Sequence, residues 1–202
     1  MTDKIVLPKF LTPDVAAFAI KSVLHGIQGS CISPFVNAAI RSVPLRRRVC
    51  DICKCSVIMC HTVVLVPTMK DERAEDYPSW PTYQLHAQLL HEHSEHKSCK
   101  AGSNSSDNVW PYKFDDIARC KSLQLWHDRN YGGTDIVPHL LFPGDTPFWG
   151  GVKRNGIVVA TSGVQPYFDK MISGMVADMC VALAYHAWLK SDDKKNDVNF
   201  LV

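Results

Sequence analysis

The sequence lacks a strong charge of either sign and lacks the long apolar segments typical of membrane proteins. Its 202 residues include 22 basic and 20 acidic side chains, a formal net charge of +2. That balance gives no support to a nucleic-acid-binding surface. No uninterrupted apolar run approaches the roughly 18–20 residues that span a bilayer, and the first residues lack the apolar segment of a secretory signal. We therefore expect a cytoplasmic protein that binds neither nucleic acid nor membranes.

The sequence also lacks the short motifs of several large enzyme classes. It contains no nucleophile elbow, no phosphate-binding loop, no dinucleotide-binding glycine fingerprint and no internal repeat. Its composition, 46% hydrophobic and 21% charged, is ordinary for a globular protein. The length suits one domain that can bury a core without disulfides or metal. We expect a single domain over residues 1–202.

Cysteine is present in quantity, but not in the setting where disulfide frameworks occur. Such frameworks belong to short secreted chains that lack a core, so we expect the eight cysteines to be reduced. Four of them follow the pattern C-x2-C-x-C-x4-C, namely Cys50, Cys53, Cys55 and Cys60. The first two are half of a zinc site or a redox pair. No second C-x-x-C follows at zinc-finger spacing, which favours a surface segment with reduced thiols.

The periodicity of apolar residues predicts an α+β domain. Helical spacing indicates helices over residues 13–28, 115–127 and 167–189. The β-branched run His61–Val66 predicts a buried strand, and Asn155-Gly156 between two apolar runs predicts a hairpin. Residues 67–114 read as a long loop insertion with one strand near residues 83–90. This order favours a mostly antiparallel sheet flanked by helices.

Three collinear motifs resemble those of a known family. They are Asp116-Ile117-Ala118-Arg119-Cys120-Lys121, Gly150-Gly151-Val152 followed by Asn155-Gly156, and Ser162-Gly163 with Asp169 six residues past the glycine. In this order they resemble the GlcG/HbpS-like family, a heme-binding or heme-degrading type of domain related to the C-terminal domain of PduO-type proteins. The resemblance implies a profilin-like fold, a homo-oligomer, and the binding of heme or another tetrapyrrole.

The sequence departs from that family in places that bear on a ligand site. Lys153-Arg154 replaces the Pro-aliphatic pair of the family's hairpin, and residues 67–114 are much longer than the family's corresponding link. The leading hypothesis is a homo-oligomer that binds a small-molecule ligand, with heme as the first candidate cofactor. The alternatives are an enzyme acting on a small carbonyl or carboxylate metabolite, and a structural oligomer with a Cys/His metal site.

Heme needs an axial donor in an apolar pocket, and the candidates are histidines on ordered elements. His127 would end the second helix, and the alternative is that it only interacts with the dipole at the C-terminal end of that helix. His186 lies on the last helix, where packing or an interface would explain it as well. We take His127, His186 and the turn Ser162-Gly163 as candidate cofactor-binding residues, with His139 as a further donor.

The densest group of metal donors is the segment His91-Glu92-His93-Ser94-Glu95-His96. On a strand, His91 and His93 would project to the same face, where with His96 they would suit zinc or another borderline metal. The spacing is H-x-H-x-x-H and not that of a zinc protease. The alternative is a solvated polar loop.

Asp169 is the leading candidate for a catalytic base. At the start of the last helix, beside Ser162-Gly163, its carboxylate would lie next to free backbone N–H groups that suit an anion. Lys121 and Asp116 would join it if the helices meet the hairpin on one side. The alternative is that Asp169 is a first-turn helix acid that satisfies orphan donors.

The last helix carries more large apolar side chains than one face of a small sheet requires. They include Met171, Met175, Met179 and Trp188. We expect part of this surface to pack against another subunit.

Overall fold

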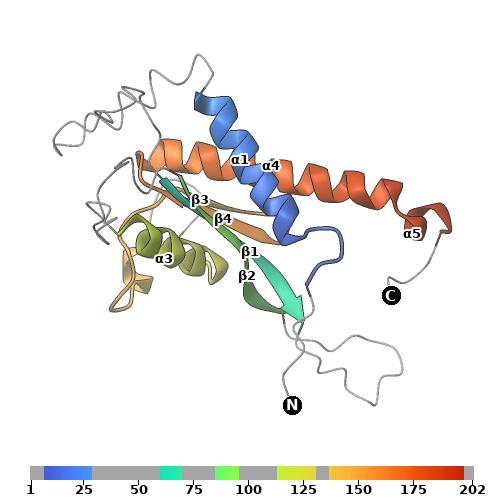
Figure 1. Ribbon diagram of the computed structural model, residues 1–202. Coiled ribbons are helices and arrows are strands. Elements are labelled where there is room, and N and C mark those ends of the chain that lie inside the picture. The colour runs from blue at the N-terminus through green and yellow to red at the C-terminus, as the bar shows by residue number, and fades with distance from the viewer. Residues whose placement is uncertain (1–6, 29–59, 70–84, 96–112, 131–136, 198–202) are drawn as a thin grey trace, which may run out of the picture.

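A four-stranded antiparallel sheet with helices on both faces forms the domain in this computed structural model (Figure 1). The structure describes residues 7–28, 60–69, 85–95, 113–130 and 137–197. The elements in chain order are α1 (Pro13–Gln28), β1 (Cys60–Met69), β2 (Leu85–Glu95), α3 (Phe114–Trp126), the 3-10 turn η1 (Pro138–Leu140), β3 (Gly151–Arg154), β4 (Ile157–Ser162), α4 (Pro166–Lys190) and α5 (Asp192–Lys195). The predicted α+β class, with an antiparallel sheet flanked by helices, is confirmed, and so are the three predicted helices.

The strand order β2-β1-β4-β3 places β1 and β4 in the centre and leaves β2 and β3 at the edges. The predicted hairpin joins β3 to β4. Asn155 and Gly156 have φ values of 49° and 78° between the paired residues Arg154 and Ile157. Two positive φ values in a two-residue loop match the twist of antiparallel strands, which explains why Asn-Gly occupies this turn.

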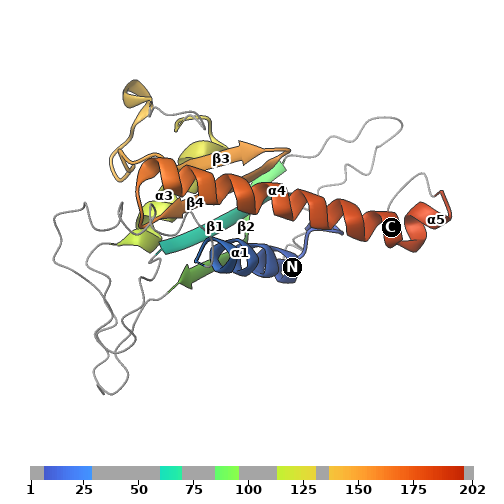
Figure 2. The ribbon, with the colours of Figure 1, turned by 90° about the horizontal axis from the view of Figure 1, so that it is seen from above.

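The two faces of the sheet bury two separate groups of apolar side chains. Because side chains alternate along a strand, β1 sends Val64 and Val66 toward α1 and α4 but Val63 and Leu65 toward α3. Figure 2 shows α1 and α4 together on one side of the sheet, with α3 on the other. Of the helices that the structure describes, only α3 covers this face, and its contacts position the buried polar groups described below.

The segment expected as an insertion contributes to the sheet. Residues 85–95 form the edge strand β2, which pairs with β1 over its whole length and has an irregularity opposite Val64 and Leu65. This strand is longer than the one expected near residues 83–90, and it includes the histidine-rich segment as far as Glu95. The remainder, residues 70–84 and 96–112, lies outside the described residues.

The helix α4 extends well beyond the sheet (Figures 1 and 2). Its 25 residues measure about 37 Å along the axis at 1.5 Å per residue, whereas the six residues of β4 span about 20 Å. Although the sequence has no uninterrupted apolar run of that length, α4 is long and apolar enough to cross a bilayer, and only 33% of its most apolar window is buried. The first half of α4 nevertheless supplies core residues such as Ile172 and Val176, as a core helix does. That the protein does not bind a membrane stays a prediction.

Candidate functional site

A buried ion pair joins α3 to the first turn of α4 at one end of the sheet. Lys121 Nζ lies 3.0 Å from Asp169 Oδ2, and the two side chains are 1% and 5% exposed. The ammonium also donates to the carbonyl oxygen of Thr161, at 2.9 Å. The structure therefore brings together two of the three predicted catalytic residues.

The second oxygen of Asp169 occupies the turn that was expected to hold an anion. Oδ1 accepts from the backbone N–H of Val164 at 3.1 Å, and the N–H of Gly163 also bonds to the carboxylate. Burial raises the pKa of Asp169, while Lys121 and the two N–H groups act in the opposite direction. The carboxylate of Asp169 itself fills the proposed anion site, and it does so as a cap of the preceding turn.

Buried hydroxyl groups extend this polar centre into the sheet. Ser173 Oγ lies 3.1 Å from Thr161 Oγ1 and 3.0 Å from the carbonyl oxygen of Gly150, and Thr161 Oγ1 lies 3.1 Å from Thr62 Oγ1. Because each hydroxyl has a partner, their burial costs little. In the sequence, Ser173, Thr161 and Thr62 lie within mostly apolar segments. Their hydroxyl groups are the only sequence feature that indicates a buried polar contact there.

The three motifs that carry the family resemblance converge at this ion pair. Gly150 has a φ of +124°, and a Cβ placed on it would lie 2.6 Å from Asp169 Cβ and 3.3 Å from Lys121 Nζ. The glycine is needed because the backbone passes directly over the buried pair. Asp116, by contrast, is exposed on α3 and pairs with Lys113 and Arg119 at 3.8 and 3.6 Å, so it does not join Lys121 and Asp169.

The candidate heme-binding residues do not form one pocket within the described part of the chain. Ser162 is buried and Gly163 half-buried in the turn that Asp169 holds. His127 is exposed just past the end of α3, and His186 is exposed on α4, 17 residues after Asp169 and about 25 Å farther along the helix. His139 is exposed in η1.

The histidine-rich segment gives two half-buried imidazoles on β2. His93 Nε2 lies 2.9 Å from Glu95 Oε2. Burial lowers the pKa of His91, and the charges nearby include Lys21 of α1. Among the residues that the structure describes, no group of three His, Cys, Asp or Glu side chains gathers to hold a metal. His96 lies outside them, and the zinc site therefore stays a prediction.

Two of the cysteines belong to the apolar core on the side of α1 and α4. Cys60 begins β1 and Cys180 lies on α4, and both are buried with free thiols. Burial raises the pKa of Cys60, and it raises that of Cys180 to about 11. Cys50, Cys53 and Cys55 lie outside the described residues.

This burial leads to a prediction about thiol chemistry. In the native protein, Cys60 and Cys180 are expected to resist alkylation at pH 8, because a buried thiol is rarely deprotonated and the thiolate is the nucleophile. Both should react at once in denaturant. Peptide mapping after iodoacetamide treatment measures this, with the half-buried Cys120 as the internal comparison. Rapid modification of Cys60 in the folded protein would contradict the prediction, and a disulfide between Cys60 and Cys50, Cys53 or Cys55 would contradict the expectation of reduced thiols.

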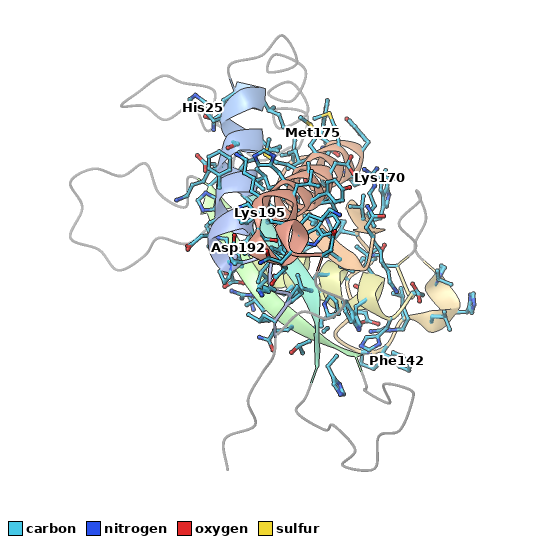
Figure 3. All side chains as sticks on the ribbon, turned by 90° about the vertical axis from the view of Figure 1, so that its right-hand side faces the viewer. His25, Phe142, Lys170, Met175, Asp192 and Lys195 are labelled. Atoms are coloured by element: carbon cyan, nitrogen blue, oxygen red, sulfur yellow. The ribbon has the colours of Figure 1, made fainter. Side chains whose placement is uncertain are left out.

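A groove outside the predicted sites lies between β3 and the outer side of α4. It measures about 350 Å³ and is lined by Arg154, Tyr167, Lys170, Met171, Gly174, Met175 and Asp178. Arg154 Nη1 lies 2.6 Å from Asp178 Oδ2 across its rim. Figure 3, which looks toward the end of α4, shows Lys170 on the side of the helix away from α1, with Met175 also on its outer side.

The sequence does contain a signal for this groove. A second stripe runs along α4 at helical spacing, formed by Tyr167, Met171, Gly174, Asp178, Ala182, Tyr185 and Leu189. Only one of these residues is charged. Most of the stripe faces away from the core, but Met171 also packs against the core and Gly174 is buried. The sequence predicted an excess of apolar side chains on this helix. Which of them face outward becomes clear only when the opposite side of α4 is packed against the sheet and α1.

Comparison with models of protein families, with curated proteins and with solved structures finds no match to this chain. The GlcG/HbpS-like resemblance rests on the three short motifs alone.

Proposed function

We propose that this chain is a homo-oligomeric binding protein for a small, largely apolar and anionic ligand, with heme or another tetrapyrrole as the first candidate. The proposal places the ligand in the groove between β3 and α4. The observation that carries it is the combination, in one open groove, of apolar side chains, thioether and phenol groups and cationic side chains.

The donor atoms come from one face of α4. Tyr167, Met171 and Met175 follow each other at intervals of four residues, so their side chains are neighbours on the helix surface. Thioether sulfur and phenol oxygen are both among the axial ligands of heme iron. Met171 is half-buried and Met175 is 41% exposed, which leaves the latter sulfur open to a ligand.

The charges at the rim suit a ligand that carries carboxylates. Arg154 and Lys170 both line the groove, and Asp178 binds Arg154. Cationic side chains suit the carboxylates of a tetrapyrrole, and an arginine can bind a carboxylate with two parallel hydrogen bonds. Arg154 is part of the pair that departs from the family's hairpin, so this feature belongs to the present chain.

The size of the groove supports the involvement of a second copy. A volume of about 350 Å³ is near the lower end for small-molecule sites, so this groove would cover one face of a planar macrocycle. The outer stripe continues past it through Ala182, Tyr185 and Leu189. A helix that is apolar on all sides is normally buried on all sides, which favours an identical subunit packed against α4.

An enzyme built on Asp169 receives less support. The carboxylate and the ammonium of Lys121 are buried and are bonded to each other and to the backbone. A base has to reach the proton that it abstracts, and a substrate would first have to displace these contacts.

Hemin titration of the purified apoprotein tests the proposed site. We expect a saturable Soret band, and at least tenfold weaker binding in Met175→Ala, because this variant lacks the proposed sulfur ligand; a tenfold change corresponds to about 1.4 kcal/mol. Met179→Ala is the matched control, because Met179 lies on the same helix but packs against the core. The proposal fails if wild-type protein gives no saturable band, or if both variants lose the same affinity.

Sedimentation at micromolar concentration tests the assembly separately. Wild-type protein is expected to sediment as an oligomer, and Tyr185→Glu with Leu189→Glu is expected to give monomers, because two charges would have to be buried in the interface. Lys195→Glu, on the exposed helix α5, controls for added negative charge. A wild-type monomer would overturn the proposed assembly without deciding whether heme binds.

A further inference from the structure

A second group of polar side chains lies on the α3 face of the sheet, at the edge formed by β2. His61 of β1 is directly opposite Ser94 of β2 in the strand register. His61 Nδ1 lies 2.9 Å from Ser94 Oγ, and His61 Nε2 lies 3.4 Å from Glu92 Oε2. Glu92 in turn binds Arg119 of α3. A serine, an imidazole and a carboxylate thus stand in sequence on two neighbouring strands.

The carboxylate determines where the proton of His61 lies. Arg119 donates from Nε to Glu92 Oε2 at 2.9 Å and from Nη2 to Oε1 at 2.8 Å, and these hydrogen bonds lower the pKa of Glu92. An ionised carboxylate only accepts hydrogen bonds, so His61 Nε2 carries the hydrogen that faces it. Nδ1 then accepts the hydroxyl hydrogen of Ser94.

The environment of His61 keeps the imidazole neutral. Its side chain is 3% exposed, and burial lowers its pKa, with Arg119 acting in the same direction and Glu92 and Asp115 opposing. A neutral imidazole can accept a proton, which a general base must do. Ser94, on an edge strand, is only half-buried, so its hydroxyl is more accessible than the base behind it.

We propose that Ser94 is an activated nucleophile that accepts an acyl group from an activated ester. A serine bonded to a base, with the base oriented by a third group, is the arrangement that activates hydroxyl nucleophiles. Ser94 Oγ forms a bond to the carbonyl carbon of the ester while its proton passes to His61 Nδ1. The bond to the leaving alkoxide breaks, and the alkoxide takes that proton and departs as the alcohol. Water then attacks the acyl carbon while His61 Nδ1 accepts a proton from it. The bond between that carbon and Ser94 Oγ breaks, Oγ takes the proton back from His61, and the carboxylic acid departs.

This site is separate from the groove between β3 and α4, so a test of one proposal does not decide the other. The groove is lined by α4 and Arg154, whereas the serine site uses β1, β2 and α3. None of its residues was a candidate nucleophile or base in the sequence, because His61 and Ser94 are 33 residues apart and become neighbours only through strand pairing.

Covalent labelling with a fluorophosphonate probe at pH 8, followed by peptide mapping, tests the proposal. Labelling is expected at Ser94, together with a burst of one p-nitrophenol per chain from p-nitrophenyl acetate. Ser94→Ala should abolish both signals, and Glu92→Gln should slow labelling because the imidazole loses the group that fixes its proton. His61→Gln should slow labelling about a hundredfold or more, the usual contribution of a general base. Ser191→Ala, at a half-buried serine that caps α5, should change nothing.

The pH dependence distinguishes activation by His61 from chance reactivity. The labelling rate should fall as the pH drops below the ordinary histidine value of 6.5, because protonated His61 cannot accept the hydroxyl proton. Two results overturn the proposal: wild-type protein that stays unlabelled at Ser94 at pH 8, and labelling that Ser94→Ala leaves unchanged. Both depend only on wild-type protein or on a one-atom truncation, so poor folding of the His61 variant would not affect the decision.

Discussion

Replacing Lys121 with alanine is expected to lower the free energy of unfolding by about 3–5 kcal/mol, the usual cost of removing one partner from a buried ion pair. Asp169 would keep its bonds to the turn N–H groups but lose the ammonium 3.0 Å away, leaving a largely uncompensated charge. Its pKa, already raised by burial, should rise further. Urea denaturation at pH 7 measures the effect.

Three further variants show whether the loss comes from the pair. Asp169→Asn should also destabilise strongly, and not by the 1 kcal/mol or less expected of an ordinary helix cap, because it leaves Lys121 charged and buried. Lys121→Met combined with Asp169→Leu should recover much of the loss, since apolar replacements of a buried pair are often neutral. Lys113→Ala, at an 85% exposed lysine, should cost less than 1 kcal/mol. A small effect of Lys121→Ala would contradict the structural role of the pair.

Gly150→Ala is expected to destabilise the fold by about 3 kcal/mol or more. Its φ of +124° lies in a region that residues with a Cβ rarely adopt, which costs roughly 1–3 kcal/mol. The added methyl group would also lie 2.6 Å from Asp169 Cβ and 2.8 Å from the carbonyl oxygen of Pro166. Overpacking of this kind typically costs a further 1–3 kcal/mol. Thermal melting measures the combined loss.

Two other glycines separate these contributions. Gly156 has a φ of +78° but open space around a Cβ, so Gly156→Ala should cost only the backbone strain, about 1–2 kcal/mol. Gly26 lies within α1 with ordinary helical φ and open space, so Gly26→Ala should stabilise by about 0.5–1 kcal/mol. If Gly150→Ala destabilises the protein no more than Gly156→Ala does, the backbone at Gly150 does not approach the ion pair as closely as described.

The parts of the fold that follow local rules could be predicted from the sequence. Pro13 and Asp14 after Thr12 start α1 where expected, and Asn155-Gly156 alone indicates the β3–β4 hairpin. The edge strand β2 was predicted only as far as Leu90, because His91–Glu95 is polar and lacks the apolar alternation of a typical strand. Its pairing with β1, not its own propensity, makes it a strand.

The candidate site was harder to predict because burial of a charge depends on distant partners. The motifs grouped Lys121 with Asp169, but the burial of this pair follows only when α3 and α4 are packed on the sheet, because the two residues are 48 positions apart. The sequence likewise placed Asp169 beside the Ser162-Gly163 turn without deciding whether its carboxylate or a bound anion accepts from the N–H groups there. The imidazole, hydroxyl and carboxylate of His61, Ser94 and Glu92 come together through strand register, which no local pattern specifies.

The charged pair on β3 also governs how copies of this chain can meet. A sheet edge exposes unpaired backbone groups that invite another strand, and natural proteins discourage such pairing with short strands and charged side chains. β3 has only four residues, and two of them are the exposed Lys153 and Arg154. Lys153 Nζ also lies 2.9 Å from Oδ1 of Asp128, which follows the end of α3, so an ion pair connects this edge with that helix. Polymerisation by strand addition is therefore disfavoured along β3, so any contact between copies of this chain has to use another part of its surface.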